Sequence, residues 1–131
     1  MNRDARIALV TRYFDAVDGE DMPGLLDTLT PDCVFTVETH GVRLEGHAQI
    51  TTMFTRLWAD HAAVLHHEFT HVSDPEGDRI AARFTVRNTE HDGSVTHKSN
   101  CNFFEIEEGR FSSVRVYMSG PNTLKNTAHD R

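Results

Sequence analysis

The order of helical and β-prone segments along the chain is the feature that most limits its fold. Apolar residues recur every three or four positions through most of residues 5–58, whereas residues 64–119 alternate with a period of two. The chain therefore predicts three N-terminal helices with one short strand among them, followed by four strands. Helices and strands segregated in this way are typical of an α+β domain.

Glycine, proline and aspartate mark the boundaries of the predicted helices. The first helix ends at Gly19, and Asp21 can cap the second, which ends before Pro31. A short β-prone run follows at residues 33–38, and the third helix starts near Gly46. These three helices are short enough to cover one face of a curved sheet.

Turn residues separate the four β-prone runs of the second half. We expect strands at residues 64–73, 79–90, 94–107 and 110–119. Residues 120–131 are polar and predict a loose tail. A length of 131 residues supports one hydrophobic core. We therefore expect a single domain over residues 1–131, with its core at about residues 5–119.

Composition excludes several classes of partner. The formal net charge is −7 and the basic residues are scattered, which argues against nucleic acid and anionic membranes. No apolar run approaches the roughly 20 residues of a membrane span. The N-terminal residues show no signal-peptide pattern, so we expect a cytoplasmic protein. Cys33 and Cys101 are too few for a disulfide framework and predict two buried thiols.

Three histidines on one predicted strand are candidates for chemistry. Strict alternation places Leu65, His67, Phe69 and His71 on one face, and the apolar members of that set favour it as the inner face. His67 is then predicted to reach a pocket, while His66 faces outward. His67 and His71 would lie roughly 13 Å apart along the strand. That spacing does not suit a metal site, and we expect neither a metal nor a cofactor.

Four stretches give the chain a resemblance to a known family. These are RYFDAVDGED, LLDTLTPDCVF, EGHAQITTMF and FFEIEEGRFSSVRVYM. Together they resemble the SnoaL-like branch of the nuclear transport factor 2-like superfamily over nearly all of residues 5–119. The resemblance implies a cone, in which a curved mixed β-sheet wraps around a pocket covered by the three helices. The fold hosts isomerases, dehydratases, epoxide hydrolases, cyclases and binders, so the resemblance is specific for fold and weak for activity.

Comparison with the ketosteroid isomerases of this superfamily implies an oxyanion site. Tyr13 matches their oxyanion-hole tyrosine, and Asn102 stands where they carry a protonated aspartate. An amide can donate the same hydrogen bond. Their catalytic base aligns with Val37, while Glu38 is one residue away and would face the other side of the strand or the pocket mouth.

The dehydratases and cyclases of the superfamily imply other arrangements. Asp18 resembles the dehydratase aspartate that pairs with a histidine, although Val17 replaces the tyrosine that often precedes it. The partner histidine would be His67 or His71. Residues 118–119 are Met and Ser where the polyketide cyclases place an acid, which lowers that alternative.

These observations predict a small-molecule enzyme of the dehydratase or isomerase type that uses acid–base chemistry without a cofactor on a mostly apolar substrate, which can be cyclic. The predicted catalytic residues are Tyr13, Asp18, His67 and Asn102. The predicted pocket lining is Met53, Phe54, Leu57, Phe69, Phe84, Val86, Asn88, Asn100, Phe104, Val114, Val116 and Met118. The alternatives are a non-catalytic binding protein, a polyketide cyclase or epoxide hydrolase activity, and a protein-interaction adaptor whose cone is filled.

The outer face of the predicted sheet needs a cover of its own. Alternation along the last strand places Phe111 and Tyr117 opposite Val114 and Val116. Because the three helices can cover one face alone, we expect a homodimer through the outer face of the sheet.

Overall fold

The computed structural model describes residues 1–125 and confirms the predicted α+β cone. Its helices are α1 (Arg3–Asp18), α2 (Met22–Asp27) and α3 (Gly46–Asp60), with a single 3-10 turn, η1, at Glu38–His40. Its strands are β1 (Leu29–Val37), β2 (Val42–Glu45), β3 (Ala63–Ser73), β4 (Arg79–Thr89), β5 (Val95–Glu107) and β6 (Arg110–Tyr117). No helix within residues 1–125 is long and apolar enough to cross a membrane.

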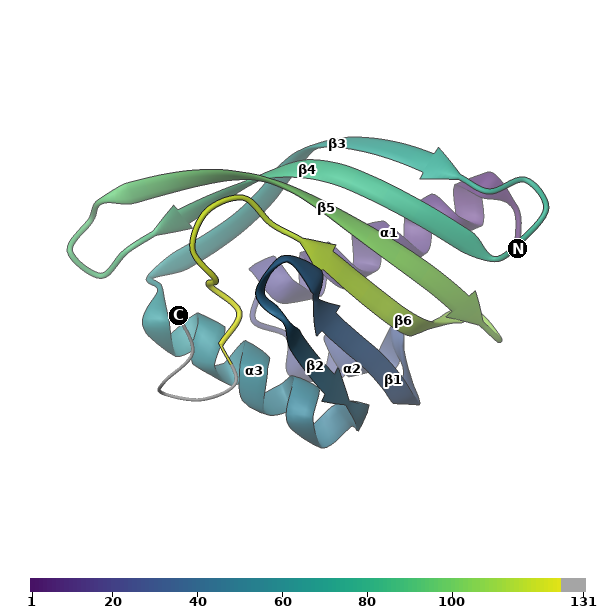
Figure 1. The fold of residues 1–131 in the computed structure, drawn as a ribbon, viewed down its shortest axis with the longest axis horizontal. Coiled ribbons are helices and arrows are strands. Elements are labelled where there is room, and N and C mark those ends of the chain that lie inside the picture. The colour runs from purple at the N-terminus through teal and green to yellow at the C-terminus, as the bar shows by residue number, and fades with distance from the viewer. Residues whose placement is uncertain (126–131) are drawn as a thin grey trace.

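The six strands form one curved mixed sheet in the order β2-β1-β6-β5-β4-β3. β1 runs parallel to β6, and all other neighbours are antiparallel. Figure 1 shows the helices on the concave side of this sheet. α1 packs on β3 and β4, whereas α3 packs on β1 and β2. β1, the first strand of the chain, therefore lies beside β6, the last strand. The core lies between the sheet and the helices.

Side-chain caps explain where the first two helices begin. The side chain of Asn2 accepts a hydrogen bond from the backbone N–H of Ala5 at 2.8 Å. Asp21 accepts one from the N–H of Gly24 at 3.0 Å, which confirms the predicted cap. The chain then departs from the prediction, since α2 ends at Asp27 and β1 already begins at Leu29. The segment between Gly41 and Gly46 holds the short strand β2, for which the sequence analysis predicts no strand.

A β-bulge in β3 changes which histidine faces the core. His67 pairs with Thr85 but Thr70 pairs with Arg83, so two residues of β3 lie opposite one of β4. Glu68 takes the left-handed backbone conformation that this requires, with φ of 60°. The inner face consequently carries Val64 and His66 before the bulge, and Phe69, His71 and Ser73 after it. The predicted placement was therefore right for Phe69 and His71 and wrong for Leu65 and His67.

A second irregularity lies where β5 meets β6. Phe104 pairs with Val114 but Ile106 pairs with Phe111, so β6 carries an extra residue there. Phe111 is consequently fully buried and stacks on Phe104 with ring centroids 4.4 Å apart. The prediction that Phe111 lies on the outer face is wrong for this reason. Tyr117, beyond the irregularity, does lie on the outer face and is 43% exposed.

The segment after β6 is not a loose tail as far as the structure describes it. Figure 1 shows residues 118–125 leaving β6 and turning back toward α3. Asn122 is buried, and its side-chain oxygen accepts the backbone N–H of Leu124 at 2.9 Å. Residues 126–131, which were included in the predicted tail, lie outside the described residues.

Candidate functional site

A small cavity lies inside the cone, between the ends of α1 and α3 and the inner faces of the strands. Its volume is about 30 Å³, which is room for one or a few water molecules. Aromatic and aliphatic side chains form most of the wall, and His66, Asn100, Asn102 and the hydroxyl-bearing Tyr13 are its polar members. The remaining lining residues are Phe14, Val17, Phe35, Phe54, Leu57, Phe84, Val116 and Leu124. An apolar cavity with a few convergent polar groups is the usual form of a small-molecule site.

The carboxylate of Asp18 is joined to His66 by two hydrogen bonds. Asp18 Oδ1 lies 2.5 Å from His66 Nδ1, and Asp18 Oδ2 accepts the backbone N–H of His66 at 2.8 Å. β3 is an edge strand, so α1 supplies the acceptor for a backbone group that has no neighbouring strand on that side. The pair is largely buried, with side-chain exposures of 18% for Asp18 and 11% for His66.

The end of α1 is itself held in place by α3. The indole Nε1 of Trp58 donates a hydrogen bond to the backbone carbonyl of Val17 at 2.9 Å. This carbonyl belongs to the last turn of α1, whose carbonyl groups have no partner within the helix. Trp58 therefore helps to fix the residue next to Asp18, and with it the direction of the carboxylate.

His67, the predicted catalytic histidine, lies on the other face of the sheet. Its Nδ1 is 3.4 Å from Glu68 Oε1, and the bulge at Glu68 separates it from the inner positions further along β3. His66 replaces it beside Asp18. In a regular strand, His66 and Phe69 lie on opposite faces, because they are three residues apart. Glu68 is not one of the residues, such as Gly or Asn, that favour a left-handed backbone conformation. The sequence therefore held no signal for this bulge.

His71, the second histidine considered for the pair, faces inward but away from the cavity. Its ring stacks on Phe69 with centroids 5.7 Å apart and planes inclined by 12°. Its Nε2 is buried, with no partner within residues 1–125. Burial lowers the pKa of His71 below its ordinary value, and the positive charge of Arg3 lowers it further.

Tyr13 is buried in the aromatic core and also lines the cavity, as predicted. Its ring meets Phe54, Phe104 and Phe111 in edge-on contacts with centroids 5.6 to 6.4 Å apart. Burial raises the pKa of Tyr13 well above its ordinary value, and the nearby Cys33 adds to the effect. The hydroxyl therefore stays protonated and available as a hydrogen-bond donor.

Two of the three inward asparagines reach the cavity. Asn100 and Asn102 lie on the inner face of β5 and line the wall. The Oδ1 of Asn102 is buried, with no partner among the described residues, so it leaves hydrogen-bonding capacity for a ligand or water. Asn88 is also buried and its amide is unpartnered within the same residues, but it lies outside the cavity wall.

The predicted lining divides into residues that meet the cavity and residues that pack behind it. Phe54, Leu57, Phe84, Asn100 and Val116 line it. Those that do not line it are Met53, Phe69, Val86, Asn88, Phe104, Val114 and Met118. The sequence analysis missed Phe14, Val17, Phe35, His66 and Leu124, of which the first three belong to the apolar pattern of α1 and β1.

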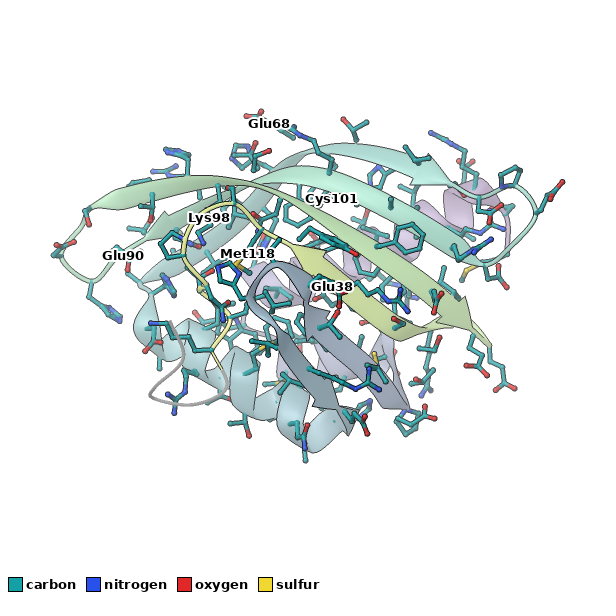
Figure 2. The ribbon with its side chains drawn as sticks, viewed as in Figure 1. Glu38, Glu68, Glu90, Lys98, Cys101 and Met118 are labelled. Carbon is teal, nitrogen blue, oxygen red and sulfur yellow. The ribbon has the colours of Figure 1, made fainter. Side chains whose placement is uncertain are left out.

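The first strand does not contribute a carboxylate to the cavity. Val37, which aligns with the isomerase base, is fully buried. Glu38, labelled in Figure 2, is exposed in η1. It lines a depression on the outer face together with Arg43 and Arg115. Among residues 1–125, no three His, Cys, Asp or Glu side chains gather closely enough to hold a metal ion.

The two cysteines have different surroundings. Cys33 is fully buried, as predicted, whereas Cys101 is half-buried on β5 and paired with Tyr117 of the outer face. Burial raises the pKa of Cys33 to about 12, with a further contribution from Asp32, and burial also raises the pKa of Cys101. Neither thiol lines the cavity.

The geometry around His66 determines what the site can do chemically. Because Nδ1 points to a carboxylate, the neutral ring carries its proton there and presents the lone pair of Nε2. A histidine oriented in this way on a cavity wall can accept or donate a proton. Tyr13 and the amides of Asn100 and Asn102 are the groups on the same wall that can donate to an oxygen atom.

Known proteins share this architecture. Residues 10–114 match the SnoaL-like domain family. A proposed polyketide cyclase from Xanthomonas campestris pv. campestris superimposes with a TM-score of 0.82 at 21% identity, over 89% of this chain and 92% of that one. A second proposed polyketide cyclase, from Pseudomonas putida KT2440, gives 0.75 at 24% identity, over 83% and 87%. TerC, crystallised with polyporic acid, gives 0.70 at 18% identity, over 86% and 89%.

These identities are low enough that the solved structures show a common fold and carry no activity over to this chain. No curated protein matches the sequence. The family match covers most of the chain, and the described fold agrees with it. The protein is a member of the SnoaL-like domain family.

Proposed function

We propose that this protein is a small-molecule enzyme of the dehydratase or isomerase type that uses acid–base chemistry without a cofactor. The observation that carries the proposal is the double hydrogen bond between Asp18 and His66 at the cavity wall. A carboxylate on Nδ1 sets the tautomer, holds the ring and stabilises the imidazolium that forms when Nε2 takes a proton.

The polar lining suggests roles for the other residues. His66 Nε2 removes a proton from the carbon next to a substrate carbonyl, and the electron pair moves onto the carbonyl oxygen. Tyr13 and Asn102 donate hydrogen bonds to that oxygen. The imidazolium of His66 then returns the proton, either to a β-hydroxyl group that leaves as water or to another carbon. The first outcome is a dehydration and the second an isomerisation.

The walls of the cavity favour an apolar substrate of modest size. Phe14, Phe54, Phe84 and Leu124 line the cavity together with its polar groups. A volume of about 30 Å³ does not hold a ring, so substrate binding must displace a side chain. Leu124 is the lining residue that belongs to no helix or strand and is therefore the one most easily moved.

The test is proton exchange on simple ketones, which carry the C–H next to a carbonyl that the proposed step requires. Each of two ketones, 2-tetralone and 3-hydroxycyclohexanone, is incubated with the protein in D2O and followed by NMR. We expect exchange of the protons next to the carbonyl, and water loss from the hydroxyketone, in the wild-type protein. His66→Ala should abolish both, whereas His67→Ala, one residue away on the outer face, should retain them. Equal rates for wild type and His66→Ala would contradict the mechanism.

A non-catalytic binder is the second candidate, and the small cavity with an Asn102 Oδ1 that has no partner within residues 1–125 favours it. The same experiment separates the two functions. Ketones that shift the signals of cavity residues without any protein-dependent exchange would favour binding. The cyclase alternative draws on the names of the similar structures, but Met118 is buried at the end of β6 where that activity would place an acid.

We also propose that a second copy of the chain covers the outer face of the sheet. Phe103 and Tyr117 are exposed by 38% and 43% on neighbouring strands, and Leu65 is exposed by 45% on β3. Arg115 pairs in register with Phe103, and Glu105 follows on the same face, so the face carries both signs of charge around its apolar residues. Sedimentation of the wild type should show a dimer that Phe103→Glu dissociates, and a wild-type monomer at high concentration would refute it.

A further inference from the structure

Lys98 is a buried cation on the inner face of β5. Its exposure is 8%, and it precedes Asn100 of the cavity wall by two residues on the same face. Its Nζ donates to the backbone carbonyl of Pro121 and lies 3.8 Å from the sulfur of Met118. Figure 2 shows Lys98 and Met118 beside the segment that follows β6. None of the ion pairs within residues 1–125 includes Lys98.

A buried ammonium without a carboxylate partner is uncommon. Withdrawal of such a charge from water is unfavourable unless hydrogen bonds or an opposite charge compensate it. Burial accordingly lowers the pKa of Lys98. An ammonium group has three donors, of which one meets a backbone carbonyl and one a thioether sulfur, which is a weak acceptor. Lys98 can therefore gain more from an anion than from these two uncharged partners.

The segment after β6 is fastened to β5 next to Lys98, through Ser119. The N–H of Ser119 donates to Asn100 Oδ1 at 3.2 Å, and the N–H of Ser99 donates to Ser119 Oγ at 3.1 Å. The buried side chain of Asn122 then turns the chain so that Leu124 reaches the cavity. The segment thus places an oxygen atom on Lys98 and an apolar side chain against the aromatic wall.

We propose that Lys98 is the anchor for a carboxylate group of the ligand, and that residues 121–124 occupy the ligand's place when no ligand is bound. The carbonyl of Pro121 stands where the carboxylate binds, and the side chain of Leu124 stands where an apolar ring binds. The ligand class is a small aromatic or alicyclic carboxylate. Successive inward residues of a strand lie about 7 Å apart, which matches the span from a carboxylate to the far side of its ring.

This inference rests on the cavity being the ligand site of the proposed function, and it is independent of proton transfer by His66. It adds that the ligand is an anion, and this addition rests on the contacts of Lys98. The experiment therefore measures binding rather than turnover, with benzoate as the probe and benzamide as its neutral analogue.

The first measurement is an NMR titration of the full chain at fixed ionic strength. We expect benzoate to bind more tightly than benzamide, and Lys98→Met to weaken benzoate binding by about tenfold or more, as for a lost charge-assisted hydrogen bond. Benzamide binding should change little. Arg87→Met is the matched control, since it removes the same charge from the exposed face of neighbouring β4 and should leave the preference for benzoate intact.

The second measurement uses Leu124→Ala, which leaves Lys98 in place. Removal of the internal competitor should tighten benzoate binding, and Lys98→Met in that background should cancel the preference. The proposal is overturned if benzoate and benzamide bind alike, if Lys98→Met binds benzoate as the wild type does, or if neither the wild type nor Leu124→Ala binds benzoate. His66→Ala should lose proton exchange yet keep the Lys98-dependent preference, so failure of the catalytic proposal and failure of this one are distinguishable.

Discussion

Replacement of Asp18 by Asn tests whether the carboxylate holds His66 in place. The carboxylate accepts from the ring Nδ1 at 2.5 Å and from the backbone N–H at 2.8 Å. A hydrogen bond to a charged group contributes roughly 1.5–3 kcal/mol to the free energy of unfolding, and the partial exposure of both side chains favours the lower end of that range. The Asn amide keeps one acceptor and loses the charge. We therefore expect Asp18→Asn to lower the free energy of unfolding by about 2 kcal/mol.

The matched control is Asp15→Asn, one turn earlier on the same helix. Asp15 is exposed, and both substitutions remove a negative charge from the C-terminal half of α1, so both relieve the same repulsion by the helix dipole. The difference between the two variants in urea denaturation then isolates the contacts to His66. We expect Asp15→Asn to change stability by less than about 0.5 kcal/mol.

A second readout distinguishes orientation of the ring from stability alone. In the wild type, the neutral ring of His66 should carry its proton on Nδ1, which nitrogen-15 chemical shifts report directly. Asp18→Asn should populate the Nε2–H tautomer. The reasoning is refuted if Asp18→Asn is no less stable than Asp15→Asn, or if the His66 nitrogen shifts are the same in both variants.

Three further predictions concern strain, acid stability and thiol reactivity. Glu68→Gly should stabilise the fold by up to about 1 kcal/mol, since φ is 60° there, and Glu68→Val should destabilise it by a similar amount; the reverse order in urea denaturation would contradict the bulge. Burial and the charge of Arg3 lower the pKa of His71 below 6.5. Its contribution to the free energy of unfolding is therefore complete above pH 6.5 and is lost as the pH falls through the lowered pKa. Between neutral and acidic pH, the free energy of unfolding should therefore fall less in His71→Gln than in the wild type. An equal fall in the two proteins would contradict a lowered pKa of His71. Iodoacetamide should modify Cys101 well before Cys33 in the native protein, because Cys33 is fully buried with a pKa of about 12; equal rates by mass spectrometry would contradict this.

Local sequence patterns were sufficient to predict most of the architecture. Asp21 caps α2 as expected, and the turn at Glu108 and Gly109 joins β5 to β6. These features depend on side chains acting within a few residues of themselves. The mixed character of the sheet came from the family resemblance, and the parallel pairing of β1 with β6 was not predicted, because contacts between distant segments leave no periodic trace in one sequence.

The candidate site was only partly predictable, and the failures have a common physical cause. Asp18 and Tyr13 lie on a helix, whose period is regular, and both are where the sequence indicated. His67 was misplaced because strict alternation was carried from Phe69 back across a bulge, and the extra residue there exchanges the faces on its two sides. Phe111 was misplaced for the same reason in β6. Leu124 was missed because a polar segment gives no pattern from which its contacts could be inferred.

The bulge in β3 explains how one edge strand places inward side chains at two ends of the cone. Without it, alternation would turn His66 inward and Phe69 outward, or the reverse. With it, His66 meets Asp18 at one end, while Phe69 packs on Phe14 and Phe84 with ring centroids 5.1 and 5.6 Å apart. Left-handed backbone at Glu68 costs about 1–2 kcal/mol, and full burial of a Phe side chain returns about 1.5–3 kcal/mol, of which the partly buried Phe69 gains a part. The packing of Phe69 therefore offsets part of the strain, so the bulge places a histidine beside a carboxylate at a reduced cost in stability.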